Sequence, residues 1–404
     1  MEKIILPNNL TIIAVKKPTQ SITLQATIKV GSNHEAAKTR GISHFIEHLL
    51  FEGTTTRSAF EIASTIESKG GDFGAFTSNT RTAYYIKLLK KHLPLAITIL
   101  ADMLQNPAFK KDIIERERNI VLSELRMRQD EPRSYQWELL QSTMYTKHPA
   151  QYPVIGYEKT ISTFTKKQFQ DFFKATYIPS NIILTLVGNY TPAHLDLLKS
   201  TFAKLPSTKA TKKLIPKEPL QKANRKKSIT KDINHCYLNI GFHAVQKSHK
   251  DAPVLDIIDA ILGMPLSGRL FRQIRQATSL CYDIGSHFDD ETDYGFFAVY
   301  LSTQKKNLAK AKSLLLQQIQ NVDKITPKEF ADVKSYIEGD LLLTMEDTQK
   351  YADELAFAQY TNSSLDVATY IKKIKAVTKA DITRIKNKYL KYYTETMIQG
   401  KHQK

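Results

Sequence analysis

The chain has 404 residues, and this length favours two or more packed domains over one simple core. Hydrophobic residues make up 42% and charged residues 24%, which is ordinary for a globular protein and excludes wholesale disorder. The net charge is +18, but the charges are scattered and no nucleic-acid motif accompanies them. We interpret them mainly as a lysine-rich solvated surface, without a specific nucleic-acid partner.

The cellular compartment is indicated by what the sequence lacks. No run of about 18 apolar residues occurs, and the opening MEKIILPNNLTIIAV has no apolar core of an export signal. Cys236 and Cys281 are too few for a disulfide framework and fit a reducing compartment. Cys236 is a poor nucleophile candidate, because adjacent His235 would point to the opposite face of a strand. We expect a cytoplasmic protein without membrane association.

The first half of the chain predicts an α+β fold with an antiparallel sheet. Its hydrophobic periodicity alternates between the repeat of a strand and the repeat of a helix. Strands are expected near 3–16, 22–31, 72–78, 82–89 and 182–188. Helices are expected near 41–51 and 58–68, more than one between about 92 and 145, and others near 166–176 and 191–204.

The second half predicts a similar order of elements. Strands are expected near 229–243, in a hairpin across 289–293 and near 396–399, and helices near 251–262, 267–277 and 305–391. Between the halves, prolines among many lysines and arginines indicate a basic linker. The prediction is two tandem homologous α+β domains, each an antiparallel sheet packed with helices, at 1–204 and 228–404, joined by a linker at 205–227.

The segment GISHFIEHLLFEG contains His44 and His48, four residues apart. On a helix this spacing places both imidazoles on one face, where they can bind one metal ion. Glu47 precedes His48, so its carboxylate can reach a water on the metal without being a ligand. Zinc lowers the pKa of such a water towards about 7, and a carboxylate can pass its proton to a leaving amine. The pattern indicates zinc-dependent peptide hydrolysis.

The alternative is a surface helix with two incidental histidines, since a chance H-x-x-E-H is expected on the order of once in a hundred such chains. A catalytic zinc usually has three protein ligands. The helix predicted at 110–129 offers Glu124 and Glu117 on a seam that is otherwise apolar. A competing apolar face leaves the choice of buried seam open. One face carries Ile113, Ile120 and Met127 with the two glutamates. The competing face carries Ile114, Val121 and Leu125.

HFIEH, followed by Glu124 in ERERNIVLSELR, resembles the pitrilysin family of metallopeptidases, also called M16 or inverzincins. The resemblance implies that His44, His48 and Glu124 are zinc ligands and Glu47 is the general base. Glu117 matches a further family glutamate one heptad earlier, which would support the ligands. The second half has no copy of H-x-x-E-H, so we expect one zinc ion per chain.

The segment GGDFGAFTSNTRTAYYIKLL predicts an antiparallel strand pair whose edge could hold an extended peptide. It is similar to the family's substrate-binding strand, GGxxNAxT. Gly74 stands where the family usually has asparagine, so the resemblance implies backbone pairing around Ala75 but no side-chain contact at position 74. Without the resemblance, an ordinary hairpin explains the segment equally well.

The segment SGRLFRQIRQATSLCYDIGSH predicts a helix, a turn and a strand. It resembles the family's RLFxxLRxxxGLxY, which implies that Arg275 and Tyr282 bind substrate and help to stabilise the tetrahedral intermediate. A guanidinium and a phenol are suitable donors to a peptide carbonyl. Ser279 replaces a frequent glycine. Without the family, Arg275 would most often be a surface residue and Tyr282 a core residue.

The shorter branch of the family, which includes mitochondrial processing peptidase and bacterial relatives, implies that one chain forms half of a clam-shell chamber. We therefore expect a homodimer, each site combining zinc of one subunit with Arg275 and Tyr282 of the other. A heterodimer with an inactive homologue is the alternative. The expected substrate is a peptide or unfolded polypeptide. A non-catalytic assembly subunit and a nucleic-acid-binding protein are the rival functions.

Overall fold

The protein is described here by a computed structural model that covers residues 1–206 and 214–401. The described chain forms two compact units. Unit 1 contains Met1–Met127, Tyr152–Ile215 and Thr344–Tyr360, and unit 2 contains Arg128–Gln151, Pro216–Leu343 and Thr361–Lys404. Each unit thus includes a segment from the other half of the sequence. The predicted ranges 1–204, 205–227 and 228–404 stay a prediction, and residues 207–213 of that linker lie outside the described residues.

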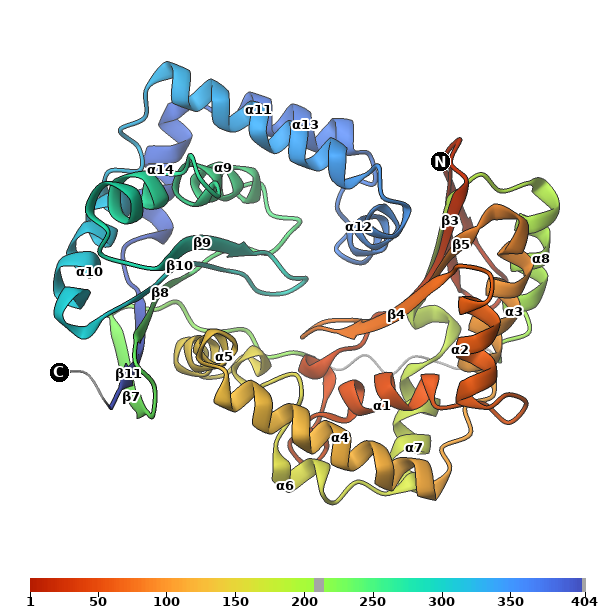
Figure 1. Ribbon diagram of the computed structural model, residues 1–404. Coiled ribbons are helices and arrows are strands. Elements are labelled where there is room, and N and C mark those ends of the chain that lie inside the picture. The colour runs from red at the N-terminus through yellow and green to blue at the C-terminus, as the bar shows by residue number, and fades with distance from the viewer. Residues whose placement is uncertain (207–213, 402–404) are drawn as a thin grey trace. The chain divides into compact units, whose positions relative to one another are not determined.

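Unit 1 is built on a six-stranded sheet with the order β1-β2-β6-β3-β5-β4 (Figure 1). Neighbouring strands are antiparallel except for β2 and β6, which are parallel. The predicted antiparallel sheet is therefore wrong for this one pair, because the chain returns to the sheet by a long crossover before β6. The strands are β1 (Glu2–Ile5), β2 (Thr11–Lys16), β3 (Ser21–Ile28), β4 (Asp72–Thr77), β5 (Thr82–Leu89) and β6 (Ile182–Gly188).

Helices cover both faces of this sheet. Figure 1 shows the sheet between α12 on one side and α3 with α8 on the other. The helix α1 packs against β4, β5 and α7. The helices are α1 (Ile42–Phe51), α2 (Ala59–Glu67), α3 (Leu93–Gln105), α4 (Lys111–Asp130), α6 (Glu158–Ile161), α7 (Lys166–Thr176), α8 (Pro192–Phe202) and α12 (Thr348–Tyr360).

The strand β3 shows how both faces become buried. Its apolar residues, such as Leu24, belong to the hydrophobic core, whereas the alternate polar residues point to the other face. There the Thr23 hydroxyl lies 2.8 Å from the Thr348 hydroxyl, and Gln25 donates to Asp353 at 3.0 Å. The polar face of β3 is therefore covered by α12, which comes from the second half of the sequence.

Unit 2 contains a five-stranded sheet with the order β7-β11-β8-β10-β9, parallel only between β7 and β11. The predicted antiparallel sheet is again wrong for one pair. The single strand that the sequence predicts at 229–243 is divided into two strands, β7 and β8, in the structure. The elements are β7 (Arg225–Lys231), β8 (Cys236–His243), β9 (Asp283–Asp289), β10 (Phe296–Thr303), β11 (Thr394–Gly400), α5 (Pro132–Met144), α9 (Ala252–Gly263), a π-helix (Phe271–Gln276), α10 (Lys305–Gln320), α11 (Pro327–Thr344), α13 (Val367–Ala376) and α14 (Lys379–Tyr389).

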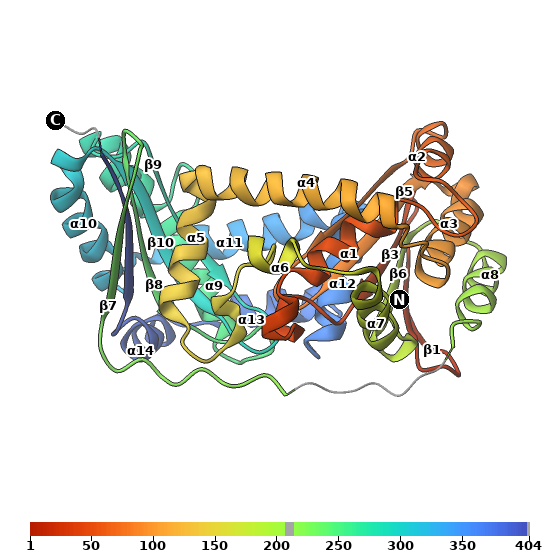
Figure 2. The ribbon, with the colours of Figure 1, turned by 90° about the horizontal axis from the view of Figure 1, so that it is seen from below.

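A helix from the first half of the sequence completes this second sheet. Figure 2 shows α5 on one face and α10 on the other. Asn239 on β8 donates to the Gln136 carbonyl of α5 at 3.2 Å. The order β7-β11-β8-β10-β9 repeats β2-β6-β3-β5-β4 strand for strand, including the parallel first pair. The predicted tandem α+β fold is confirmed, with exchanged helices as an added feature.

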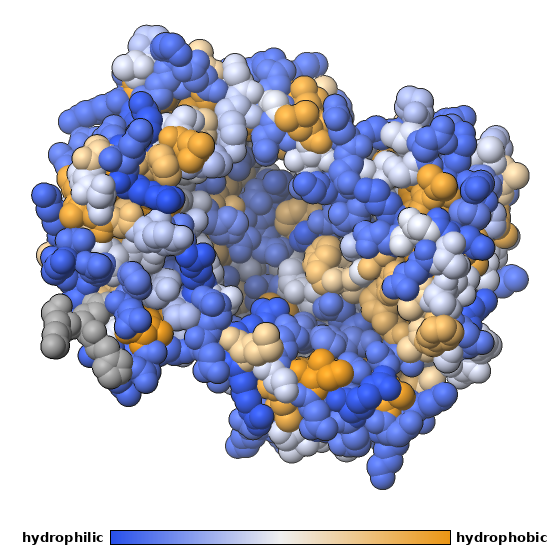
Figure 3. Space-filling view, in the orientation of Figure 1, coloured by the Kyte–Doolittle hydropathy of each residue, from blue (hydrophilic) through white to orange (hydrophobic). Residues whose placement is uncertain are grey.

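The hydropathy of the surface agrees with the amino-acid composition, in which 24% of the residues are charged. Hydrophilic side chains predominate on the face seen in Figure 3, and hydrophobic ones form small scattered groups. Among the described residues, none of the helices combines the length and apolar character that a membrane crossing requires.

Gly241 on β8 allows α5 to approach closely, because a Cβ there would lie 2.4 Å from Met144 Cε and 2.9 Å from Leu140 Cδ1. We predict that Gly241→Val lowers the free energy of unfolding by about 1–3 kcal/mol through overpacking, measured by urea denaturation. Gly339→Ala on α11 is the matched control, since no described atom beyond its own helix lies within 4 Å. It should be neutral or stabilising by up to about 1 kcal/mol. Equal losses in the two variants would contradict the packing argument.

Candidate metal centre

The helix α1 begins at a glycine that few other residues could replace. Gly41 has φ +96°, and a Cβ there would lie 2.4 Å from the Ile155 carbonyl oxygen. The buried carboxylate of Glu35 accepts hydrogen bonds from the amides of Gly41 and Ser43, both at 2.8 Å. These bonds satisfy donors of the first helical turn, which otherwise lack partners. Glu35 therefore holds the start of the helix that carries the paired histidines.

The helix α1 has an apolar face and an opposite face that carries the two histidines. The apolar positions are buried in the core of unit 1: Ile42, Phe45, Ile46, Leu49 and Leu50. His44 is buried on the other side, and Glu47 and His48 are partly exposed. Phe51 packs on the core and lies 5.3 Å from the ring of Phe73 on β4.

The helix α4 presents Glu117 and Glu124 to α1. Of the two faces that its sequence left open, the one with Ile114, Val121 and Leu125 is the core face. On the competing seam, Ile120 and Met127 are 47% and 70% exposed, so that seam is not a buried apolar track. Glu117 is buried and Glu124 is partly exposed.

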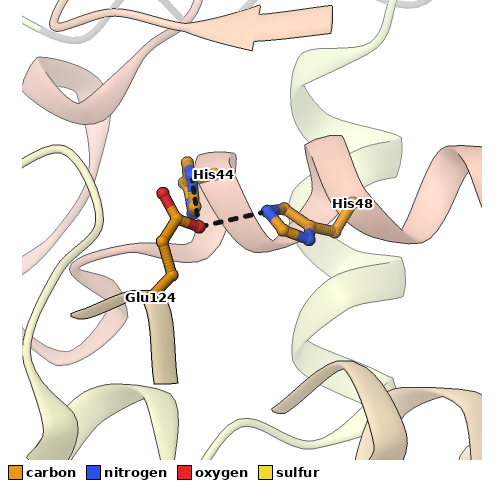
Figure 4. A group of neighbouring side chains, drawn as sticks. All are labelled: His44, His48 and Glu124. Atoms are coloured by element: carbon orange, nitrogen blue, oxygen red, sulfur yellow. Dashed lines mark ion pairs between the residues drawn. The ribbon is translucent and has the colours of Figure 1, made fainter. Parts of the chain in front are cut away.

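Two imidazoles and one carboxylate converge between these helices (Figure 4). The distance from Glu124 Oε2 to His44 Nε2 is 3.6 Å, and the distance to His48 Nε2 is also 3.6 Å. Ligand atoms on a tetrahedral zinc ion lie about 3.3–3.6 Å apart, given bonds of about 2.0–2.2 Å. The donor types and their spacing therefore fit zinc. Among the described residues, these three are the group of His, Cys, Asp or Glu side chains close enough to hold a metal ion.

Glu117 contacts the second histidine from its other side. Its Oε2 lies 3.4 Å from His48 Nδ1, so one ring nitrogen of His48 faces Glu117 and the other faces Glu124. Burial raises the pKa of Glu117, but His48 and Arg116 outweigh burial and lower it overall. Burial lowers the pKa of His48, but Glu117 and Glu124 outweigh burial and raise it to about 9. This strongly negative surrounding suits a bound cation.

Glu47 lies on the same helix beside His48. Its Oε2 accepts a hydrogen bond from the Thr77 hydroxyl at 2.6 Å, and Thr77 is the last residue of β4. The last residue of β4 is therefore hydrogen-bonded to the predicted general base.

The predicted peptide-binding strand β4 lies at the edge of the sheet and pairs with β5. Ala75 is opposite Tyr84, and Gly74 is opposite Tyr85. The segment is thus a hairpin whose outer strand lies at the edge of the sheet, and peptide binding there stays a prediction.

Arg275 and Tyr282 lie near each other in unit 2, with the guanidinium 5.7 Å from the centre of the phenol ring. Arg275 belongs to the π-helix, a rare conformation that is common at functional sites. Ser279 between them has φ +52°, where the family's glycine would be unstrained. Tyr282 is 67% exposed, unlike the core tyrosine that an isolated sequence suggests. The candidate metal centre belongs to unit 1.

Several contributors were not identified from the sequence. Glu35 and Thr77 act through hydrogen bonds between segments, and only the local sequences GSNHE and GAFT could have drawn attention to them. Burial raises the pKa of the Cys281 thiol to about 11, so this thiol stays protonated at neutral pH and is a poor nucleophile.

Comparison with known proteins identifies the family. Residues 11–158 match the family model Insulinase (Peptidase family M16), and residues 163–337 match the Peptidase M16 inactive domain. An uncharacterized zinc protease of Rickettsia felis is 30% identical, covering 98% of this chain and 96% of that protein. The uncharacterized zinc protease YmxG of Bacillus subtilis is also 30% identical, over 84% and 83%.

Solved structures agree with these relatives. The crystal structure of a protease from Helicobacter pylori matches with a TM-score of 0.92 at 25% identity, covering 98% of this chain and 99% of that chain. A peptidase M16 inactive domain from Pseudomonas fluorescens matches in fold with a TM-score of 0.90. This chain therefore shares its duplicated α+β fold with a protein described as a protease. It belongs to peptidase family M16, the pitrilysin or insulinase family.

Glu35 should make the stability of the protein depend on pH. Burial raises the pKa of Glu35 to about 7, against the opposing effect of the hydrogen bonds from Ser43 and Gly41. A raised carboxyl pKa means that the folded state binds an additional proton between the unfolded and folded pKa values. The resulting stability is complete below the unfolded pKa and is lost as pH rises through about 7.

We therefore predict that the wild type loses stability relative to Glu35→Gln between about pH 5 and about pH 8. Urea denaturation of both proteins at each pH measures this difference, because other titrating groups cancel. A difference that does not change with pH would rule out the raised pKa of Glu35.

Proposed function

We propose that the protein is a zinc-dependent endopeptidase that hydrolyses peptides or unfolded segments. The observation that carries the proposal is the convergence of His44 Nε2, His48 Nε2 and Glu124 Oε2 beside Glu47. Two imidazoles and one carboxylate are a frequent ligand set of catalytic zinc, which keeps a further position for water or substrate. The family membership and the zinc proteases among its relatives support the same activity.

His44, His48 and Glu124 would hold the ion, and Glu117 would orient His48 through its second ring nitrogen. A zinc ion in this place would supply Lewis acidity, lowering the pKa of water towards about 7 and polarising a peptide carbonyl. Glu47 would accept the proton of the attacking water and deliver it to the leaving amine nitrogen. The hydrogen bond from Thr77 fixes one oxygen of the Glu47 carboxylate and so orients the group for this transfer.

The substrate would pair with β4 as an additional strand, because an outer strand offers backbone donors and acceptors to an extended peptide. Arg275 and Tyr282 would donate hydrogen bonds to the oxygen that becomes negative during the reaction. Binding in an extended conformation excludes compact folded proteins and selects peptides or unfolded segments.

The general base can be separated from the zinc ligands by mutation. We predict that Glu47→Gln reduces peptide hydrolysis by at least about a hundredfold, because proton transfer is lost, while about one zinc ion per chain remains bound. Glu124→Gln should lose both zinc and activity. Glu115→Gln is the matched control on α4, since Glu115 is exposed and pairs with Arg118.

Zinc analysis and a fluorogenic peptide assay measure both properties. Hydrolysis by Glu47→Gln near the wild-type rate would refute the assigned base. A wild-type protein that binds zinc without turnover would instead support the rival function as a non-catalytic assembly subunit.

We also propose that the active form is a homodimer in which each site combines the zinc ligands of one subunit with Arg275 and Tyr282 of the other. The proposal is supported by the presence of both groups on one chain, in different units. A heterodimer with an inactive homologue is the alternative partner.

Mixing two inactive variants tests the shared site. Glu47→Gln and Tyr282→Phe should each be nearly inactive alone. A mixed dimer would contain one intact site, because Glu47 of one subunit meets Tyr282 of the other, so activity should return on subunit exchange. If exchange is confirmed by mass measurement and activity stays absent, the shared site is excluded. A stable monomer of the wild type that cleaves peptides would exclude the dimer.

A further inference from the structure

The outer strand β4 has a glycine, Gly74, near its middle, so no side chain projects from this position. Gly74 is opposite Tyr85 of β5, so the two residues point to the same face of the sheet. A Cβ on Gly74 would lie 2.9 Å from the Tyr85 hydroxyl oxygen and 3.0 Å from ring atom Cε1. The far end of the phenol therefore lies over Gly74 and fills the space that a side chain at position 74 would occupy.

This face is the one away from the metal centre. The alternate residues of β4 face α1, where Phe73 contacts Phe51 and Thr77 donates to Glu47. Tyr85 shares its face with Asp72, whose Oδ2 accepts a hydrogen bond from the phenol at 3.4 Å. Figure 1 shows α1 below the hairpin of β4 and β5. Tyr85 therefore cannot be a catalytic residue, although it lies on β5, which pairs with the strand that ends beside the proposed base Glu47.

The side chain of Tyr85 extends from β5, the second strand from this edge of the sheet, over the outer strand β4. Neighbouring strands are about 4.8 Å apart, and the ring of Tyr85 spans this distance across Gly74. A peptide added to β4 would present every second side chain to the same face. The peptide residue beside Gly74 would then lie next to the Tyr85 hydroxyl and the Asp72 carboxylate.

We propose that Tyr85 is a specificity-determining residue that binds the substrate side chain beside Gly74, in place of a polar side chain on β4 itself. The inference rests on the proposed peptidase function and names its substrate class. A hydroxyl has one proton and two acceptor positions, and its proton is directed to Asp72. Together the phenol oxygen and the carboxylate favour a peptide side chain that donates hydrogen bonds, such as an amide, a hydroxyl or an ammonium group.

In this proposal Gly74 and Tyr85 act together, because the glycine leaves the space that the phenol occupies. An asparagine at position 74 would require the space that the phenol occupies, so the Tyr85 side chain would have to move away from Gly74. Burial raises the pKa of the Tyr85 phenol, and Asp72 adds to the shift, so the hydroxyl keeps its proton at neutral pH.

The test measures binding without turnover. In a Glu47→Gln background, fluorescence anisotropy gives the Kd of a fluorescein-labelled peptide that the wild type cleaves, and of its single-alanine derivatives. Tyr85→Phe should weaken binding of the parent peptide about two- to tenfold, the value of one net hydrogen bond. It should have no effect on the derivative whose donor side chain beside Gly74 is replaced by alanine.

A rescue variant separates this role from a structural one. Tyr85→Ala should weaken binding, and Gly74→Asn should do so alone because it clashes with the ring. The double variant Gly74→Asn with Tyr85→Ala should bind more tightly than either single variant, because the amide takes the vacated space. Tyr190→Phe is the matched control, since Tyr190 also donates to a carboxylate, Glu2, and Glu2 belongs to β1 at the other edge of the same sheet.

Two outcomes would overturn the inference. One is an unchanged Kd in Tyr85→Phe, and the other is an equal loss for every alanine derivative. If the wild-type protein still cleaves peptides and binds zinc, either result leaves the proposed peptidase function unaffected. A wild type that neither binds zinc nor cleaves peptides would defeat the proposed function itself.

Discussion

Two imidazoles and two carboxylates pack together between α1 and α4, and the candidate metal centre of unit 1 depends on this contact. His48 faces a carboxylate from each of its ring nitrogens, and Glu124 is shared between both histidines. Carboxylates so close together require a positive partner, which is a protonated histidine or a metal ion. The geometry depends on the start of α1, because a small rotation of this helix would separate both histidines from Glu124.

The surrounding fold limits such a rotation in two ways. Glu35 holds the first turn by two backbone hydrogen bonds, and the apolar side of α1 is buried in the core of unit 1. The sheet beneath is in turn covered by α12 from the far half of the sequence, just as α5 completes the sheet of unit 2. Neither half of the chain therefore contains all the elements of one unit, and the metal centre depends on contacts between distant segments.

The strand β4 connects the candidate metal centre with the outer edge of the sheet. Its end donates to Glu47, its outer edge lies at the end of the sheet, and Tyr85 covers its glycine from the neighbouring strand. One short strand thus contacts Glu47 of α1 through Thr77 and the phenol of Tyr85 through Gly74. The position of the family's asparagine is filled here by a side chain from another strand, which no comparison of position 74 alone would reveal.

The sequence by itself determined the features that depend on local spacing. The spacing of four positions from His44 to His48 places both on one face of a helix, alternation identifies β3 and β5, and the pattern HFIEH with Glu124 indicates the family. Only the tertiary structure decided which face of α4 is buried, that β2 pairs in parallel with β6, and that α5 and α12 are exchanged. Glu35, Thr77 and Tyr85 act on residues that other segments bring near. Local periodicity contains no information about which distant segment covers a face, because that choice depends on the complementary packing of whole elements.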